Sequence, residues 1–340
     1  MKKFNYLLGA AAMMVAMVFA SCSNDDLPTP GIFNGDDLST AIANHTEIVN
    51  GVPTVKLPAG VSLTLNEAIV ANAPLAIIGK ADDPAVIKMG KDGKFVGGVK
   101  IENVIIDATE MTSPLVTLAT ADAPEWTFTS VNFTNVIIGG LKKALVYSGG
   151  KNYNAALYVE DCRIQVAGNT TVFDFTKGSI PFIFNIKNST FCAPEATSKA
   201  FFSSQAGQKA SEMGEGTLLE FDFENSTFYN LAKDKNFFEQ RDKGQKCLHF
   251  TIKDNIFVNC GKSGQTIKGL NGGQASANPT WAVSGNVFNF DGADTSADET
   301  TGDDDEPITN SKAVVVNFAD PDNGDFSQSD VKAGDPFWYE

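Results

Sequence analysis

A sevenfold repeat of alternating apolar and polar residues dominates the chain between residues 99 and 288. Each copy has apolar residues four and two positions before, and three positions after, a residue that is Asn, Asp, Ser or Gly. This alternation predicts a β-strand with one buried face, and the turn-forming residue predicts a sharp bend after that strand. The predicted bend residues are Asn103, Ser130, Asp161, Asn188, Asn225, Asp254 and Gly285.

The spacing of these bends predicts the fold class. They lie about 27 to 37 residues apart, which suits one solenoid coil of three short strands and their loops. We therefore predict an all-β parallel β-helix. The rival β-sandwich would not need the same inward pattern in every repeat. Asn side chains stacked at the bends are expected to hydrogen-bond along the axis.

Two further columns of residues support the solenoid. A second apolar segment recurs after the bends, at residues 144–147, 171–175, 200–202, 236–238 and 265–267. The outward position just before the bend holds Glu160, Lys187, Glu224 and Lys253 on successive coils. Because neighbouring strands lie about 4.8 Å apart, we interpret this column as a structural ladder of alternating charge.

Both ends of the solenoid are expected to carry caps. Residues 36–45 predict a short capping helix, and residues 55–65 and 75–80 predict strands of the first coil. The β-helix domain is expected over residues 32–340, with an acidic solvated loop at about 291–306 and a C-terminal cap at about 313–340.

The N-terminus predicts export and lipidation. Residues 1–21 have a basic start and a short apolar run over residues 6–20, typical of a signal peptide. That run is shorter than the roughly 20 residues of a membrane-spanning helix. Cys22 follows small residues in a stretch that resembles a lipobox, so we expect lipidation of Cys22 and a tether over residues 22–31. The acidic pair Asp25-Asp26 resembles a surface-export signal and predicts a lipid-anchored outer-membrane protein exposed on the cell surface.

Composition argues against several function classes. The net charge of −15 and the pI of about 4.6 disfavour nucleic acid, whose phosphates attract Lys and Arg. There are two arginines, Arg163 and Arg241, and two histidines, His45 and His249. A His-based metal cluster or a Ser-His-Asp triad is therefore not expected, and His249 is interpreted as structural or simply exposed.

The cysteines beyond Cys22 predict no metal site. Cys162, Cys192, Cys247 and Cys260 lack CxxC spacing, which argues against zinc. Export permits disulfides, but the sequence cannot pair these residues, so buried free thiols are the default expectation. The acidic run 303–305 lacks the glycine and the spaced ligands of an EF-hand calcium loop, and no metal site is assigned.

With the lipobox, the Asn-x-x-Phe coils and the Phe-Ala-Asp-Pro-x-Asn-Gly-Asp-Phe segment at 318–326 in place, the chain resembles a known group. It is similar to the pectate-lyase-like, right-handed parallel β-helix lipoproteins of Bacteroidota. The resemblance covers roughly residues 30–340. It implies association with an outer-membrane glycan-uptake system, and it supplies no catalytic residues because the group has no settled activity.

Glycan binding without catalysis is the first functional hypothesis. Aromatic rings stack on sugars, and Tyr147, Tyr153, Tyr158 and Tyr229 are expected to be exposed. Trp126 and Trp281 fall on inward positions and are expected in the core. Tyr147, Arg241, Asp242 and Lys243 are the candidate ligand-binding residues.

The alternative is a polysaccharide lyase or glycoside hydrolase. A lyase needs a cation against the uronate carboxylate and a base for the α-proton, whereas a hydrolase needs paired carboxylates. The candidates are Asp174, Glu239, Arg241 and Lys268, although residues 239–243 can also pair their own charges at a turn. No cofactor is expected, except that a lyase of this kind would use Ca²⁺. A structural or adhesive surface protein is the third hypothesis.

Overall fold

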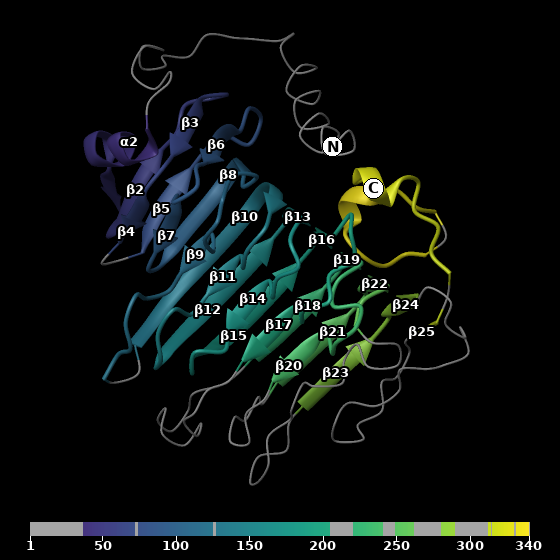
Figure 1. Cartoon of the computed structure of the whole chain (residues 1–340). Helices are drawn as coiled ribbons and strands as arrows, with labels where there is room; N and C mark the ends of the chain where they lie inside the picture. The colour runs from purple at the N-terminus through teal and green to yellow at the C-terminus, as the bar shows by residue number, and fades with distance from the viewer. Residues whose placement is uncertain are drawn as a thin grey trace.

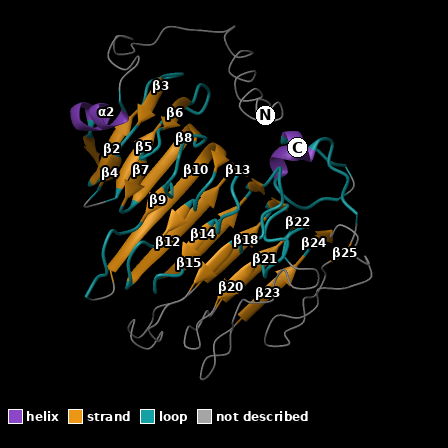
Figure 2. Cartoon of the chain, in the orientation of Figure 1, coloured by secondary structure: helices purple, strands orange, loops and turns teal. Residues whose placement is uncertain are grey.

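The protein is a right-handed parallel β-helix, as the repeat predicts (Figure 1). The computed structural model describes residues 37–71, 74–124, 127–204, 220–240, 249–261, 280–289, 312–313, 315–329 and 331–339. Strands and short turns make up most of this part of the chain (Figure 2). None of the described helices is long and apolar enough to cross a lipid bilayer.

Three strand columns form the sides of the solenoid. The first column precedes the bends and contains β2 (Val52–Lys56), β5 (Leu75–Ile78), the first half of β8 (Val99–Asp107) and of β10 (Thr127–Leu141), β12 (Tyr153–Glu160), β15 (Ile180–Lys187), β18 (Glu220–Glu224), β21 (His249–Lys253) and β23 (Thr280–Ser284). Every neighbouring pair in it is parallel.

The second column follows the bends. It contains β3 (Ser62–Leu65), β6 (Ala85–Met89), the second halves of β8 and β10, β13 (Arg163–Val166), β16 (Thr190–Cys192), β19 (Thr227–Tyr229), β22 (Ile256–Val258), β24 (Val287–Asn289) and β25 (Lys312–Ala313). The third column contains β4 (Ala68–Val70), β7 (Lys94–Val96), β9 (Val116–Thr117), β11 (Val146–Tyr147), β14 (Phe173–Phe175), β17 (Phe202–Ser204) and β20 (Phe238–Gln240). The recurring segments at 144–147, 171–175, 200–202 and 236–238 belong to this third column, as predicted; the segment at 265–267 lies outside the described residues.

The predicted bends are correct in six coils and wrong in one. Asn103, Asp161, Asn188, Asn225, Asp254 and Gly285 all have positive φ angles. In the remaining coil the bend is Asn135, at φ 50°, and not Ser130. Val131 and Phe133 pair with Val99 and Ile101 of the coil before. The error arose because β10 runs through fifteen residues, and two of its turn-forming residues, Ser130 and Asn135, are each flanked by a suitable apolar pattern.

Polar side chains tie the coils together at the bends. Asn135 donates to Asn103 Oδ1 at 2.8 Å, and Asn188 donates to Asp161 Oδ1 at 3.2 Å, which confirms the predicted hydrogen bonds along the axis. A second ladder lies inside the solenoid, one residue after the bends. There Ser226 N–H donates to Asn255 Oδ1 at 3.0 Å, and Asn255 N–H donates to Asn286 Oδ1 at 3.1 Å. These buried side chains satisfy backbone groups that the sharp bends leave without a strand partner.

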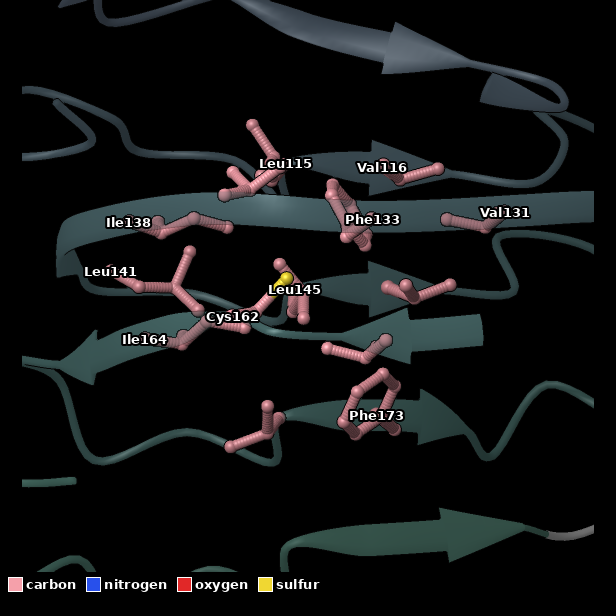
Figure 3. Close-up of a cluster of buried hydrophobic side chains, with 14 of the residues drawn as sticks. Leu115, Val116, Val131, Phe133, Ile138, Leu141, Leu145, Cys162, Ile164 and Phe173 are labelled. Carbon is pink, nitrogen blue, oxygen red and sulfur yellow. The ribbon is translucent and has the colours of Figure 1, made fainter. Parts of the chain in front are cut away.

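The core is one continuous apolar cluster filled from all three columns. Figure 3 shows Val131, Phe133 and Ile138 of β10 beside Leu115, Leu145 and Phe173. Further along, Phe191, Phe228, Phe257 and Phe288 form a stack, with successive ring centroids 5.8, 4.9 and 5.3 Å apart. Cys162 and Cys192 are buried free thiols, as expected, and Cys260 is buried as well, whereas Cys247 lies outside the described residues.

Both ends carry caps. At the N-terminal end, helix α2 (Leu38–His45) buries Leu38 and Ala41 against the first coil, and its N-cap residue Asp37 accepts from Ser39 N–H at 2.7 Å. Strand β1 (Glu47–Val49) pairs antiparallel with β2. At the other end, residues 315–329 and 331–339 form the C-terminal cap, which includes η2 (Pro321–Asn323) and η3 (Pro336–Trp338). The acidic loop predicted at 291–306 lies outside the described residues.

Candidate functional site

The C-terminal cap covers one side of the solenoid. Val316 and Ala333 pack on Ile256, Val258 and Val287, which lie in the second column. The cap is fastened by Asp335, whose carboxylate accepts from Thr190 Oγ1 at 2.8 Å and lies 3.5 Å from the Arg163 guanidinium. Figure 1 shows the cap beside β16, β19 and β22. Arg163 is thus a structural residue, and ligand contacts must be sought on the other faces.

The outer face of the first column carries two polar rows. The row beside the bends reads Glu102, Thr134, Glu160, Lys187, Glu224 and Lys253, which confirms the register of the predicted charge ladder. The middle row, two residues earlier in each strand, reads Lys100, Asn132, Tyr158, Asn185, Asp222 and Thr251. All of these side chains are partly or fully exposed, so both rows face solvent.

An aromatic patch adjoins these rows at the upstream end of the strands. Phe128 is 55% exposed, and its ring meets the ring of Phe182 edge to face, with centroids 5.5 Å apart. Phe182 is the extra residue of a β-bulge in β15, because Ala155 pairs with Pro181 whereas Ala156 pairs with Ile183. Tyr158 stands two residues beyond Ala156 on the same outward face. Apolar rings and hydrogen-bonding groups are therefore contiguous on this sheet.

A charge cluster lies in the middle of the polar rows. Lys187 Nζ lies 2.9 Å from Asp222 Oδ2 and 3.8 Å from Glu224 Oε2, and Asn185 donates to Asp222 Oδ2 at 3.3 Å. The second carboxylate oxygen of Asp222 is buried and receives no hydrogen bond. The cluster thus holds one ammonium against two neighbouring carboxyl groups.

The proton affinities in this cluster follow from that arrangement. The hydrogen bond to Asp222 and the nearby carboxylates raise the pKa of Lys187, so the ammonium stays charged. Burial and a hydrogen bond to Asp222 raise the pKa of Glu224, although Lys187 and Lys253 oppose that rise. Such a cluster can both donate to and accept from hydroxyl groups of a ligand.

The third column brings three of the predicted site residues into a single outer row. Tyr147 pairs with Asp174, Asp174 with Ser203, and Ser203 with Glu239 on successive coils. Asp174 is engaged locally, because its Oδ1 accepts from both the N–H and the hydroxyl of Thr176 at 3.0 and 2.6 Å. Burial and the Asp174 carboxylate raise the pKa of Tyr147.

The structure changes the expectation for two tyrosines. Tyr153 is half-buried and packs against the core. Tyr229 contacts Phe318 and Phe326 of the C-terminal cap, with ring centroids 6.2 and 5.5 Å apart. Both were predicted to be exposed. Tyr153 instead lies on the inward side of β12, in line with the core residue Ala155, and the C-terminal cap covers part of Tyr229. Tyr147 and Tyr158 do lie on outward rows.

Several predicted site residues lie outside the described residues. They are Cys22, Trp126, Arg241, Asp242, Lys243 and Lys268. Trp281 pairs in register with Phe250, on the inward row of the first column, but its side chain is not among those described. Within the described ranges, no three His, Cys, Asp or Glu side chains gather as a metal ion would require.

Sequence reasoning missed Phe128 because of the misplaced bend. A bend at Ser130 puts Phe128 on an inward position, whereas the true bend at Asn135 shifts the register by an odd number of residues and turns Phe128 outward. Phe182 was missed because a bulge cannot be recognised from alternation alone. Asp222 could have been predicted from the sequence, because it lies two residues before the ladder residue Glu224 and therefore faces the same side of the strand.

No protein-family model matches the chain, and no curated protein matches it in sequence. Among solved structures, a PL6 family alginate lyase aligns over 86% of this chain and 40% of its own, at 14% identity and a TM-score of 0.41. The chain therefore spans about two fifths of the length of that lyase. The pectin methylesterase of Aspergillus niger aligns over 88% of this chain and 95% of its own, at 10% identity and a TM-score of 0.35.

Proposed function

We propose that this protein binds a neutral glycan on the outer face of its first strand column, and that lipid on Cys22 holds it at the cell surface. The observation that carries the proposal is the exposed Phe128 ring, paired with Phe182 and continuous with two rows of hydrogen-bonding side chains. The rows repeat at every coil, about 4.8 Å apart, so the face offers an extended strip to a polymer.

The chemistry of this face suits a sugar. A sugar ring has an apolar C–H face and a rim of hydroxyl groups. An aromatic ring offers a large apolar surface at low entropic cost, and a few placed polar groups fix the orientation of a ligand. Phe128 supplies the apolar contact, with the partly buried Phe182 against it, while Asn132, Asn185 and Asp222 lie further along the same outward face to receive and donate hydrogen bonds.

The charge of the face favours a neutral polymer over an acidic one. The outward positions of its described strands present five carboxyl groups and four ammonium groups. The carboxyl groups are those of Glu102, Glu160, Glu220, Asp222 and Glu224, and the ammonium groups are those of Lys56, Lys100, Lys187 and Lys253. The whole chain has a net charge of −15. The net negative charge of the protein would repel uronate polymers, whereas it would not repel uncharged hexose polymers.

Binding is favoured over catalysis because the charged groups on this face are engaged with each other. Lys187 forms ion pairs with both Asp222 and Glu224. One observation supports a hydrolase as the second candidate, because Asp174 and Glu239 occupy one outer row two coils apart. Two coils correspond to about 10 Å between backbones, close to the roughly 6.5–9.5 Å carboxyl separation of inverting glycosidases.

A glycan panel tests the proposal and separates it from the alternatives. The chain from residue 22 onward, with Cys22→Ser, contains every described residue and needs no lipid. It would be passed over immobilised mannan, β-glucan and xyloglucan, and over alginate and polygalacturonate. We expect retention on at least one neutral polymer, with no new reducing ends and no unsaturated products.

The other outcomes have distinct meanings. New reducing ends that vanish in Glu239→Gln would support the hydrolase and displace pure binding. Retention on the uronate polymers alone would contradict the neutral-glycan proposal. No retention and no products would leave a structural or adhesive role. Surface exposure is tested separately by protease digestion of intact cells, with Cys22→Ala as the variant that should lose the anchor.

A further inference from the structure

Asn154 has an unusual environment within the proposed glycan-binding face. It belongs to β12, in which Ala155, Leu157 and Val159 belong to the core cluster, so Asn154, Ala156 and Tyr158 take the outward positions. Yet Asn154 is completely buried, and neither its amide oxygen nor its amide nitrogen has a hydrogen-bond partner. A buried amide without partners costs free energy and calls for an explanation.

The two strands that carry the aromatic pair flank this residue. Asn154 pairs in register with Phe128 on one side, and the contact between Phe128 and Phe182 joins the strands on either side of β12. That contact crosses β12 along the stretch 154–156, where Ala156 is small and almost fully buried. Phe128 is itself more than half exposed, so one side of its ring faces solvent instead of packed side chains.

We propose that Asn154 is the polar centre of a ligand-gated subsite, resting on the glycan-binding function proposed above. In the free protein the Phe128 ring closes over the amide. When a sugar arrives, the ring swings aside and stacks on the apolar face of the sugar, and the Asn154 amide hydrogen-bonds one of its hydroxyl groups. An amide both donates and accepts, which matches a hydroxyl on both counts.

The subsite explains why a polar residue is placed there at a cost. Leucine would fill similar space without leaving two unpaired polar atoms, so the free protein gains nothing from the amide. The bound protein gains a hydrogen bond in a site shielded from water, where such bonds are strongest. The free energy spent on the unpaired amide in the free state is then recovered on binding.

Two variants and one spectroscopic probe test this subsite. Asn154→Leu keeps the volume and removes both hydrogen-bonding groups, while Ser148→Ala is the matched control. Ser148 is also completely buried with an unpartnered hydroxyl, but it follows β11 in the third column, away from the proposed site. Each protein, as the chain from residue 22 with Cys22→Ser, would be titrated calorimetrically with cellohexaose, laminarihexaose and mannohexaose.

We expect Asn154→Leu to leave the midpoint of thermal unfolding equal or higher and to weaken binding about tenfold, the value of one hydrogen bond of about 1.4 kcal/mol. Ser148→Ala should bind as the parent protein does. Phe128→Trp tests the ring movement in a protein that keeps Asn154. The fluorescence of the new indole should shift when the oligosaccharide is added, because the indole moves.

The failures can be told apart. A lower unfolding midpoint with unchanged affinity in Asn154→Leu would make Asn154 a purely structural residue and overturn the subsite alone. Unchanged emission from Phe128→Trp during saturable binding would also overturn the gating. If the parent protein binds none of the three oligosaccharides, the subsite is overturned, and if it also ignores every polymer of the panel, the proposed function falls with it.

Discussion

The Asp335 carboxylate lies 3.5 Å from the Arg163 guanidinium and joins the end of the chain to the outer face of β13. The pair is shielded from water, since the Asp335 side chain is 0% and that of Arg163 17% exposed. The same guanidinium lies 3.9 Å from the centroid of the Phe337 ring, and it donates to the Asp161 carbonyl at 2.8 Å. One arginine therefore holds the C-terminal cap through Asp335 and Phe337, while its bond to the Asp161 carbonyl fixes it to the solenoid.

Removing that arginine should destabilise the protein. In Arg163→Met the Asp335 carboxylate stays buried without its cation, which typically costs about 3 to 5 kcal/mol in the free energy of unfolding. Urea denaturation would measure the loss. The double variant Arg163→Met/Asp335→Leu should be more stable than Arg163→Met, because no buried charge remains. Lys56→Met removes an exposed pair with Glu47 and should have little effect.

The stability of the cap should depend on pH through Asp335. Burial raises the pKa of Asp335 to about 6, although Arg163 and the hydrogen bond from Thr190 limit the rise. The folded state therefore holds a proton that the unfolded chain has already released. The stabilisation is complete below the unfolded pKa of about 4 and is lost as the pH rises through about 6.

Asp335→Asn provides the comparison for this pH effect. The free energy of unfolding of the parent relative to Asp335→Asn should fall by about 2 kcal/mol between pH 4 and pH 7, from a pKa difference of about two units. Urea denaturation at intervals across this range measures it. A difference between the two proteins that stays constant with pH would show that Asp335 titrates normally.

The internal polar ladder should matter more than any polar residue on the outer face. Asn255 accepts from Ser226 N–H and donates to the Phe223 carbonyl at 2.8 Å. Asn255→Ala leaves both groups buried and unpaired, so we expect a loss of about 2 to 4 kcal/mol in the free energy of unfolding. Asn185→Ala is the control on the outward row. Equal effects of the two changes would contradict the structural role of the ladder.

Phe128 should matter for binding and not for folding. Phe128→Ala removes an exposed ring, so the thermal midpoint should hardly change, while affinity for the retained glycan should fall about tenfold. Calorimetric titration and thermal unfolding measure the two effects. Ile48→Ala is the matched control, because Ile48 is 69% exposed on β1 at the capped end. A loss of binding in Ile48→Ala of similar size would locate the ligand elsewhere.

The amino-acid sequence by itself determined the solenoid. Alternation within each repeat specifies a strand with one buried face, and repeats of about thirty residues leave stacking as the way to bury all those faces together. The bends at Asn188 and Asn225 were readable because Asn tolerates the positive φ angle that they need. The charge ladder could also be predicted, because the register between neighbouring coils follows from the repeat.

Only the tertiary structure decided which side chains meet in the candidate site. In β10 both Ser130 and Asn135 satisfy the local pattern, and pairing with β8 and β12 selects Asn135. That choice turns Phe128 from the core to the surface, and the bulge in β15 brings Phe182 to it. Such contacts depend on the register between coils and on what covers each face. The covering segment that hides Arg163 and Tyr229 comes from the far end of the chain, so no local pattern around these residues encodes it.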